Sequence, residues 1–176
     1  VGPISSNSPL LVARKDLPAN DLDGVISALR AKPDSISYGS PGMGTMQHLV
    51  MEDLQQRANV RMLHAPYKGA GPLLTDLLGG QIDFAVVATP SVAQHIKSGA
   101  LRAIGMCGDK RTAALPDVPT LRELGINTAA DAFFGLYGPA GMSSDVTARV
   151  DAAVGSILRD AAVQDKITNF GLVASH

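Results

Sequence analysis

The chain has 176 residues, enough for one large domain or for one domain with part of another. Its 15 Lys and Arg residues nearly balance 16 Asp and Glu residues without any basic run, which argues against a nucleic acid or an anionic membrane surface as the main partner. A single cysteine, Cys107, excludes an intrachain disulfide and a cysteine-rich metal site. No window approaches the roughly 18 apolar residues of a membrane span.

Short apolar runs and segments with helical spacing alternate along the chain. The runs predict strands within residues 8–17, 35–40, 60–69, 81–88, 101–108 and 132–141. The helical spacing predicts helices at 22–32, 44–54, 71–80, 90–99, 118–125 and 143–160. The apolar residues expected on one face of the first, second and last of these helices are Leu22, Val25, Ile26 and Leu29; Met46, Leu49, Val50 and Leu54; and Val146, Val150, Val154, Ile157 and Leu158, the last set facing inward. Because the strands do not alternate polar and apolar residues, we expect an α/β fold with a mostly parallel sheet covered by helices on both faces.

The stretch "ISYGSPGMGTMQHLVMEDL", residues 36–54, places glycines between a strand and a helix. Gly42 and Gly44 permit unusual backbone angles, and Ser40 and Thr45 add hydroxyl groups. Helix N-termini at the carboxyl end of a parallel sheet are ready anion sites. The turn is therefore either an anion-binding loop or a plain tight turn with Ser/Thr capping.

Three catalytic motifs fail at this turn. A phosphate loop needs Lys where Thr45 stands, and a dinucleotide fingerprint needs a third glycine where Gln47 stands. A nucleophile elbow at Ser40 needs glycine where Tyr38 stands.

Two more loops follow predicted strands and precede predicted helices. "PYKGAGP" carries Tyr67, Lys68 and Gly69, and "ATPS" carries Thr89 and Ser91. Three such loops at one edge of a sheet would converge on a single spot. The alternative is three ordinary connections with good helix caps.

The remaining candidates indicate no catalytic constellation. His48, His64 and His95 lack metal-ligand spacing, and His48 is expected to pack or to support a site. Asp76 and Asp83 are expected to be structural. Cys107 is expected to be a small buried residue at the end of a strand.

The segments "YGSPGMGTMQHL", "APYKGAGPLLTDLLGGQIDFAV", "PSVAQHIKSGALRAI", "KRTAALPDVPTLRELG" and "FGLYGPAGM" occur in this order over nearly the whole chain. The set resembles the Bug family, the extracytoplasmic solute-binding proteins of tripartite tricarboxylate transporters. The resemblance implies a two-lobed periplasmic-binding-protein type II fold that closes on a small carboxylate, without cofactor or catalysis.

Mapped onto this sequence, the resemblance implies ligand-binding residues in three loops of one lobe. They are Ser40, Gly42, Met43, Gly44, Thr45, Tyr67, Lys68, Gly69, Thr89 and Ser91. Many family members carry an Asp-Asn pair where this chain has Ala88 and Thr89, which puts side-chain contacts from the last loop in doubt.

The resemblance also implies a division of the chain. Residues 1–7 are expected to cross from a first lobe whose N-terminal part is missing, 8–125 to form the second lobe, and 126–176 to return to the first lobe as a strand and helices. A periplasmic location is implied, with a carboxylate ligand and the membrane subunits of the transporter as partners, but no nucleic acid and no membrane insertion. The full-length protein is expected to be a monomer, whereas a fragment could self-associate.

Two alternatives to transport stay open on the sequence alone. The same lobe could serve as a sensor ectodomain. An enzyme acting on an anionic substrate at the glycine turn would need a general base near Ser40 or Thr45, and His48 is the candidate that lies nearby in the sequence.

Overall fold

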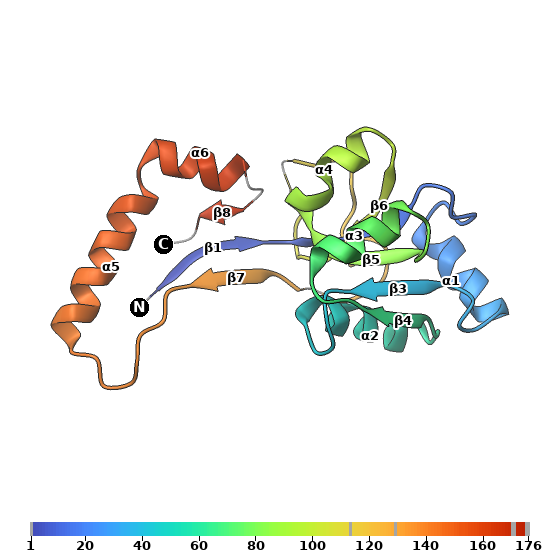
Figure 1. Ribbon diagram of the computed structural model, residues 1–176, viewed down its shortest axis with the longest axis horizontal. Helices are drawn as coiled ribbons and strands as arrows, with labels where there is room; N and C mark the ends of the chain where they lie inside the picture. Colours follow the sequence, from blue (N-terminus) through green and yellow to red (C-terminus); the bar gives the residue numbers. More distant parts are fainter. Residues whose placement is uncertain (1, 113, 129, 170–171, 175–176) are drawn as a thin grey trace. The chain divides into compact units, whose positions relative to one another are not determined.

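The computed structural model describes residues 2–112, 114–128, 130–169 and 172–174 (Figure 1). The chain divides into two compact units, one of residues 8–130 and the other of residues 1–7 and 131–176. Each unit has its own sheet.

The larger unit is built on a five-stranded sheet in the order β4-β3-β5-β2-β6. The strands are β2 (Pro9–Arg14), β3 (Ser37–Ser40), β4 (Leu63–Pro66), β5 (Phe84–Ala88) and β6 (Leu101–Met106). β3 pairs in parallel with β4 and β5, while β2 runs antiparallel to β5 and β6 on either side of it. The mostly parallel sheet is therefore confirmed, with β2 as the exception, because an apolar run reveals burial but not strand direction.

Helices cover both faces of this sheet, as predicted. α1 (Leu22–Ala31) and α2 (Met46–Ala58) pack with Leu11, Ala13 and Phe84 in one apolar cluster. α3 (Ala70–Leu78) and α4 (Thr89–Lys97) pack with Leu10, Val12 and Ala85 in the other. Consecutive residues of β2 thus serve opposite faces, since side chains alternate along a strand.

Two local predictions are wrong. Residues 118–125 do not form a helix: Thr120 bridges to Met106, and turns follow at 121–125. Leu49, predicted to share one face of α2 with Val50 and Leu54, is 57% exposed, and Met51 is buried instead. Leu49 and Val50 point about 100° apart on a helix, so α2 buries the face that also carries Leu54 and Ala58.

The smaller unit has a three-stranded sheet in the order β7-β1-β8. Its elements are β1 (Pro3–Asn7), β7 (Ala132–Gly135), α5 (Ser144–Leu158), α6 (Ala161–Asn169) and β8 (Val173–Ala174). Both outer strands run antiparallel to β1. Of the α5 residues expected to face inward, Leu158 is buried, whereas Val146 and Ile157 are 43% and 56% exposed.

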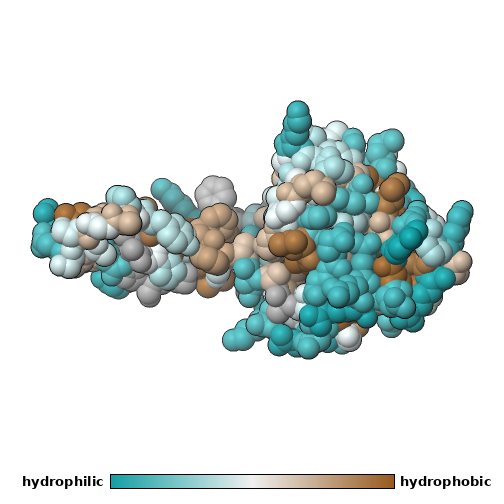
Figure 2. All heavy atoms as spheres, turned by 90° about the horizontal axis from the view of Figure 1, so that it is seen from below, coloured by the Kyte–Doolittle hydropathy of each residue, from teal (hydrophilic) through white to brown (hydrophobic). Residues whose placement is uncertain are grey.

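The exposed surface of the larger unit is mostly hydrophilic on the face drawn in Figure 2, where hydrophobic residues form small separate patches. Scattered patches of this kind are ordinary for a folded domain. Among the described residues, no helix has both the length and the apolar content needed to cross a membrane.

Candidate functional site

The loops that follow β3, β4 and β5 lie at one edge of the larger unit's sheet. These strands end at Ser40, Pro66 and Ala88, and their parallel pairing places their carboxyl ends together. The first two loops are joined directly, because Tyr67 N donates to Ser40 O at 2.9 Å and Gly69 N donates to Pro41 O at 3.0 Å. The third loop is anchored by the Thr89 hydroxyl, which donates to Ser8 O at 2.9 Å.

The glycine turn after β3, residues 40–45, is closed by its own side chains. Gly42 and Gly44 have φ angles of 155° and 74°, which other residues rarely adopt. Thr45 caps α2: its hydroxyl accepts from His48 N at 3.4 Å and donates to Gly42 O at 2.8 Å. Met43, at the tip, is 70% exposed.

The hydroxyl groups expected to contact a ligand are engaged within the protein. Ser40 is fully buried, and its Oγ lies 3.1 Å from Gly42 O and 2.7 Å from Nε2 of His64. Thr45 and Thr89 donate to main-chain carbonyls. A role for these three as ligand donors would require those bonds to be exchanged, so main-chain amides are the more available groups.

Two helices begin at this edge without a side-chain cap. α3 has Gly69 at its N-cap, with φ 103°, and α4 has Ala88 at its N-cap. First-turn amides have no acceptor within their own helix, and the helix dipole places positive potential beside them. Lys68 is exposed just before α3, and Ser91 is exposed in the first turn of α4. This combination of amides and a cation favours a small anion.

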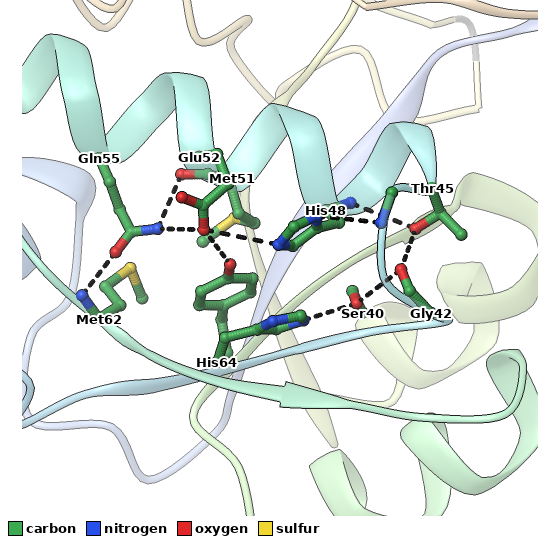
Figure 3. Close-up of polar contacts among 11 residues, drawn as sticks. Ser40, Gly42, Thr45, His48, Met51, Glu52, Gln55, Met62 and His64 are labelled. Atoms are coloured by element: carbon green, nitrogen blue, oxygen red, sulfur yellow. Dashed lines mark hydrogen bonds and ion pairs between the residues drawn. The ribbon is translucent and has the colours of Figure 1, made fainter.

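Aromatic rings support the glycine turn from beneath α2 (Figure 3). His48 and His64 stack with ring centroids 4.4 Å apart, and His64 stacks on Tyr38 at 4.6 Å. The Gly44 N–H donates to Nδ1 of His48 at 3.2 Å. Burial, then the neighbouring His48, lowers the pKa of His64 despite the opposing effect of Glu52.

Tyr38 and Glu52 complete this support. The Tyr38 hydroxyl donates to Glu52 Oε1 at 2.5 Å, and burial together with that carboxylate raises the pKa of Tyr38. Sequence reasoning predicted a supporting role for His48 but missed the parts of His64, Tyr38 and Glu52. The parallel register of β3 and β4 places Tyr38 beside His64, and a single sequence does not reveal that register.

The base nearest Ser40 is His64 rather than His48, which corrects the enzymatic alternative on this point. Ser40 is 0% exposed, however, so its hydroxyl is out of reach of a substrate. Within the described part of the chain, no group of three or more His, Cys, Asp or Glu residues is placed to hold a metal ion. The burial of Ser40 argues against catalysis by its hydroxyl.

The two aspartates expected to be structural have structural partners. Asp76 accepts from the Tyr67 hydroxyl at 2.8 Å. Asp83 accepts from Arg14 Nε at 2.8 Å and from the Ser37 amide at 2.8 Å. Cys107 is buried directly after β6, as predicted.

Comparison with known proteins places the chain in a family. Residues 1–175 match the family described as the tripartite tricarboxylate transporter family receptor. The chain belongs to this receptor family. BugT of Bordetella pertussis, one of its relatives, is 32% identical over 155 residues, covering 88% of this chain and 48% of BugT. A Cupriavidus necator protein is 38% identical over 143 residues, covering 81% of this chain and 43% of that protein.

Solved structures of other proteins share the fold. A Rhodopseudomonas palustris protein solved with adipate has a TM-score of 0.89 at 25% identity, over 99% of this chain and 58% of that one. MatC of the same species, solved with bound malate, has a TM-score of 0.87 at 28% identity, over 98% and 59%. An ancestral arginine-binding protein shares only the fold, with a TM-score of 0.56 at 10% identity.

These comparisons confirm the predicted periplasmic-binding-protein type II-like fold. The family and its structural neighbours are receptors that bind solutes rather than enzymes, so the enzymatic alternative is set aside. The chain spans about half the length of the curated relatives it matches, 43% and 48% for the two named above.

Proposed function

We propose that this chain forms part of a periplasmic solute-binding protein that captures a small organic carboxylate for a tripartite tricarboxylate transporter. The observation that carries the proposal is the pair of uncapped helix N-termini, at α3 and α4, on one sheet edge of a receptor-family chain. Neighbouring structures with adipate and with malate support a carboxylate as the ligand class.

The proposed mode of binding uses main-chain groups. The first-turn amides of α3 and α4, except at Pro72 and Pro90, which have no N–H, would donate to the carboxylate oxygens. The exposed Lys68 would add a positive charge. The glycine turn, including Met43 and Gly44, would approach the ligand closely because it lacks bulky side chains at Gly42 and Gly44. The predicted contacts from Tyr67, Gly69, Thr89 and Ser91 belong to the same site.

In the whole protein, the larger unit would be the second lobe of the trap. Residues 1–7 and 131–176, the smaller unit, would then belong to the first lobe, and closure of the two lobes would signal to the membrane subunits of the transporter. We propose that the full-length protein is a monomer with no nucleic-acid partner and no cofactor.

The proposal is tested by ligand-dependent thermal stability. Adipate or malate at 100 times its dissociation constant is expected to add about 2.7 kcal/mol to the free energy of unfolding. A neutral diamide of the same length serves as the solute control. No stabilisation by any carboxylate of a panel would overturn the carboxylate proposal.

Charge reversal at Lys68 locates the site. Lys68→Glu is expected to weaken carboxylate binding, since it places a negative charge beside the start of α3. Lys97→Glu is the matched control, because Lys97 is also exposed but lies in the last turn of α4. Equal losses in both variants would show that the anion binds elsewhere.

A further inference from the structure

Two stacked imidazole rings hold the glycine turn, one at a backbone amide and one at a side-chain hydroxyl (Figure 3). On one side, Nδ1 of His48 accepts from the Gly44 N–H at 3.2 Å. On the other, Nε2 of His64 lies 2.7 Å from Ser40 Oγ, which itself lies 3.1 Å from the Gly42 carbonyl oxygen. The turn is thereby held directly by His48 and, through the Ser40 hydroxyl, by His64.

The bond from Gly44 requires one particular state of His48. Nδ1 can accept a hydrogen bond only without a proton, so the neutral ring carries its hydrogen on Nε2. That nitrogen lies 3.7 Å from Glu52 Oε1. Protonation of the ring would place a second hydrogen on Nδ1, where it would oppose the Gly44 N–H and break this bond.

The groups that face the ring come from α2, β4 and β3. Glu52, one turn further along α2, lies with its Oε1 3.7 Å from Nε2 of His48. His64 stacks on the ring from β4. Tyr38, stacked on His64 from β3, stays neutral because it donates to Glu52 from a buried position. Histidine is the side chain that ordinarily changes charge between about pH 5 and 8, so the turn is exposed to control by pH.

We propose that His48 is a positioning residue for the ligand site, whose neutral ring holds the glycine turn in its binding conformation and whose protonation releases the turn. Acidification would then weaken carboxylate binding. The inference deepens the proposed function and rests on it for the ligand, but the link between His48 and Gly44 is a property of the unliganded chain.

The link is tested without ligand by NMR of the full chain. The Gly44 amide resonance of the wild type is expected to titrate between pH 8 and pH 5 together with the His48 ring. In His48→Asn, Oδ1 can replace Nδ1 as an acceptor that does not titrate, so the Gly44 resonance is expected to stay constant. His64→Gln is expected to retain the Gly44 titration. A Gly44 resonance that does not follow His48, or that still titrates in His48→Asn, would overturn the inference.

Binding provides the second readout, with adipate and malate as probes. Wild-type affinity is expected to fall about three- to ten-fold from pH 8 to pH 5, as for the loss of one hydrogen bond. His48→Asn is expected to lose this dependence, which removes ligand protonation as the cause, and His95→Asn is expected to retain it. Equal pH dependence in wild type and His48→Asn would refute the positioning role. If neither acid binds at any pH, the proposed function fails. The Gly44 titration, which needs no ligand, still tests whether His48 controls the turn.

Discussion

The hydroxyl of Tyr67 donates to Asp76 Oδ2 at 2.8 Å, which ties the loop after β4 to the helix that follows it. Burial, then the Asp76 carboxylate, raises the pKa of Tyr67 to about 12. Removing this hydroxyl should loosen the start of α3, one of the two helix ends proposed to bind the ligand.

Tyr67→Phe keeps the ring and is expected to lower the free energy of unfolding by about 1 to 2 kcal/mol at neutral pH. Since the folded-state pKa lies above the ordinary value of about 10, this stabilisation is present at neutral pH and is lost as the pH rises from about 10 to 12. Urea denaturation across that range measures the loss. Tyr137→Phe is the control, because Tyr137 is 76% exposed, and a loss of equal size there would contradict the assignment.

Asp83 joins β2, β3 and β5 at the end of the sheet opposite the site. Its carboxylate accepts from Arg14 Nε and from both the amide and the hydroxyl of Ser37. Burial alone would raise the pKa of Asp83, but the bonds from Ser37 and Arg14 outweigh it and lower that pKa.

Asp83→Asn is therefore expected to lower the free energy of unfolding by about 1 to 3 kcal/mol at pH 7. The contribution of a carboxylate with a lowered pKa is present above its unfolded-state pKa, about 3.9, and disappears as the pH falls through the folded-state value. The variant should accordingly show a weaker fall in stability below about pH 4 in acid denaturation. Asp16→Asn, at an exposed position, serves as the control. If the stability of Asp83→Asn falls below pH 4 as steeply as that of the wild type, Asp83 does not have this stabilising role.

Alanine substitutions at Gly44 and Gly71 measure the cost of backbone strain without a contribution from side-chain crowding. A Cβ at Gly44 or at Gly71 would meet nothing within 4 Å, but Gly44 has a φ of 74° whereas Gly71 lies in α3. Gly44→Ala is expected to lower the free energy of unfolding by about 1 to 2 kcal/mol, as the left-handed conformation costs an L-residue. Gly71→Ala is expected to raise it by about 0.4 to 1 kcal/mol. Thermal unfolding measures both changes. Equal changes in the free energy of unfolding in the two variants would contradict backbone strain at Gly44.

Much of the fold could be predicted because its signals are local. The apolar runs at residues 10–13 and 84–88 and the spacing of Leu22, Val25, Ile26 and Leu29 each reflect burial on a known face. Strand direction is not local, so the antiparallel position of β2 was not foreseen. The turns at 121–125 replace a predicted helix where Glu123 accepts from the Thr120 amide and faces Arg111.

The position of the site at one edge of the sheet was predictable, but the hydrogen bonds of its side chains were not. Glycines and hydroxyls after three strands pointed to one edge of the sheet. Which hydroxyls are free depends on neighbours distant in sequence, as when Ser40 meets His64 and Thr89 meets Ser8. The support by His64 and Tyr38 arises from the β3–β4 register, which only the assembled sheet provides.

Residue-resolved NMR titration shows whether a carboxylate binds at the amides of this edge. Adding adipate or malate to the labelled chain is expected to shift the amide resonances of Met43, Gly44, Gly69 and Ser91 along one saturable curve. The amides of β2 and of the far ends of α3 and α4 should remain in place. Shifts confined to other parts of the chain, or no saturable shift with either acid, would show that carboxylates do not bind at this edge.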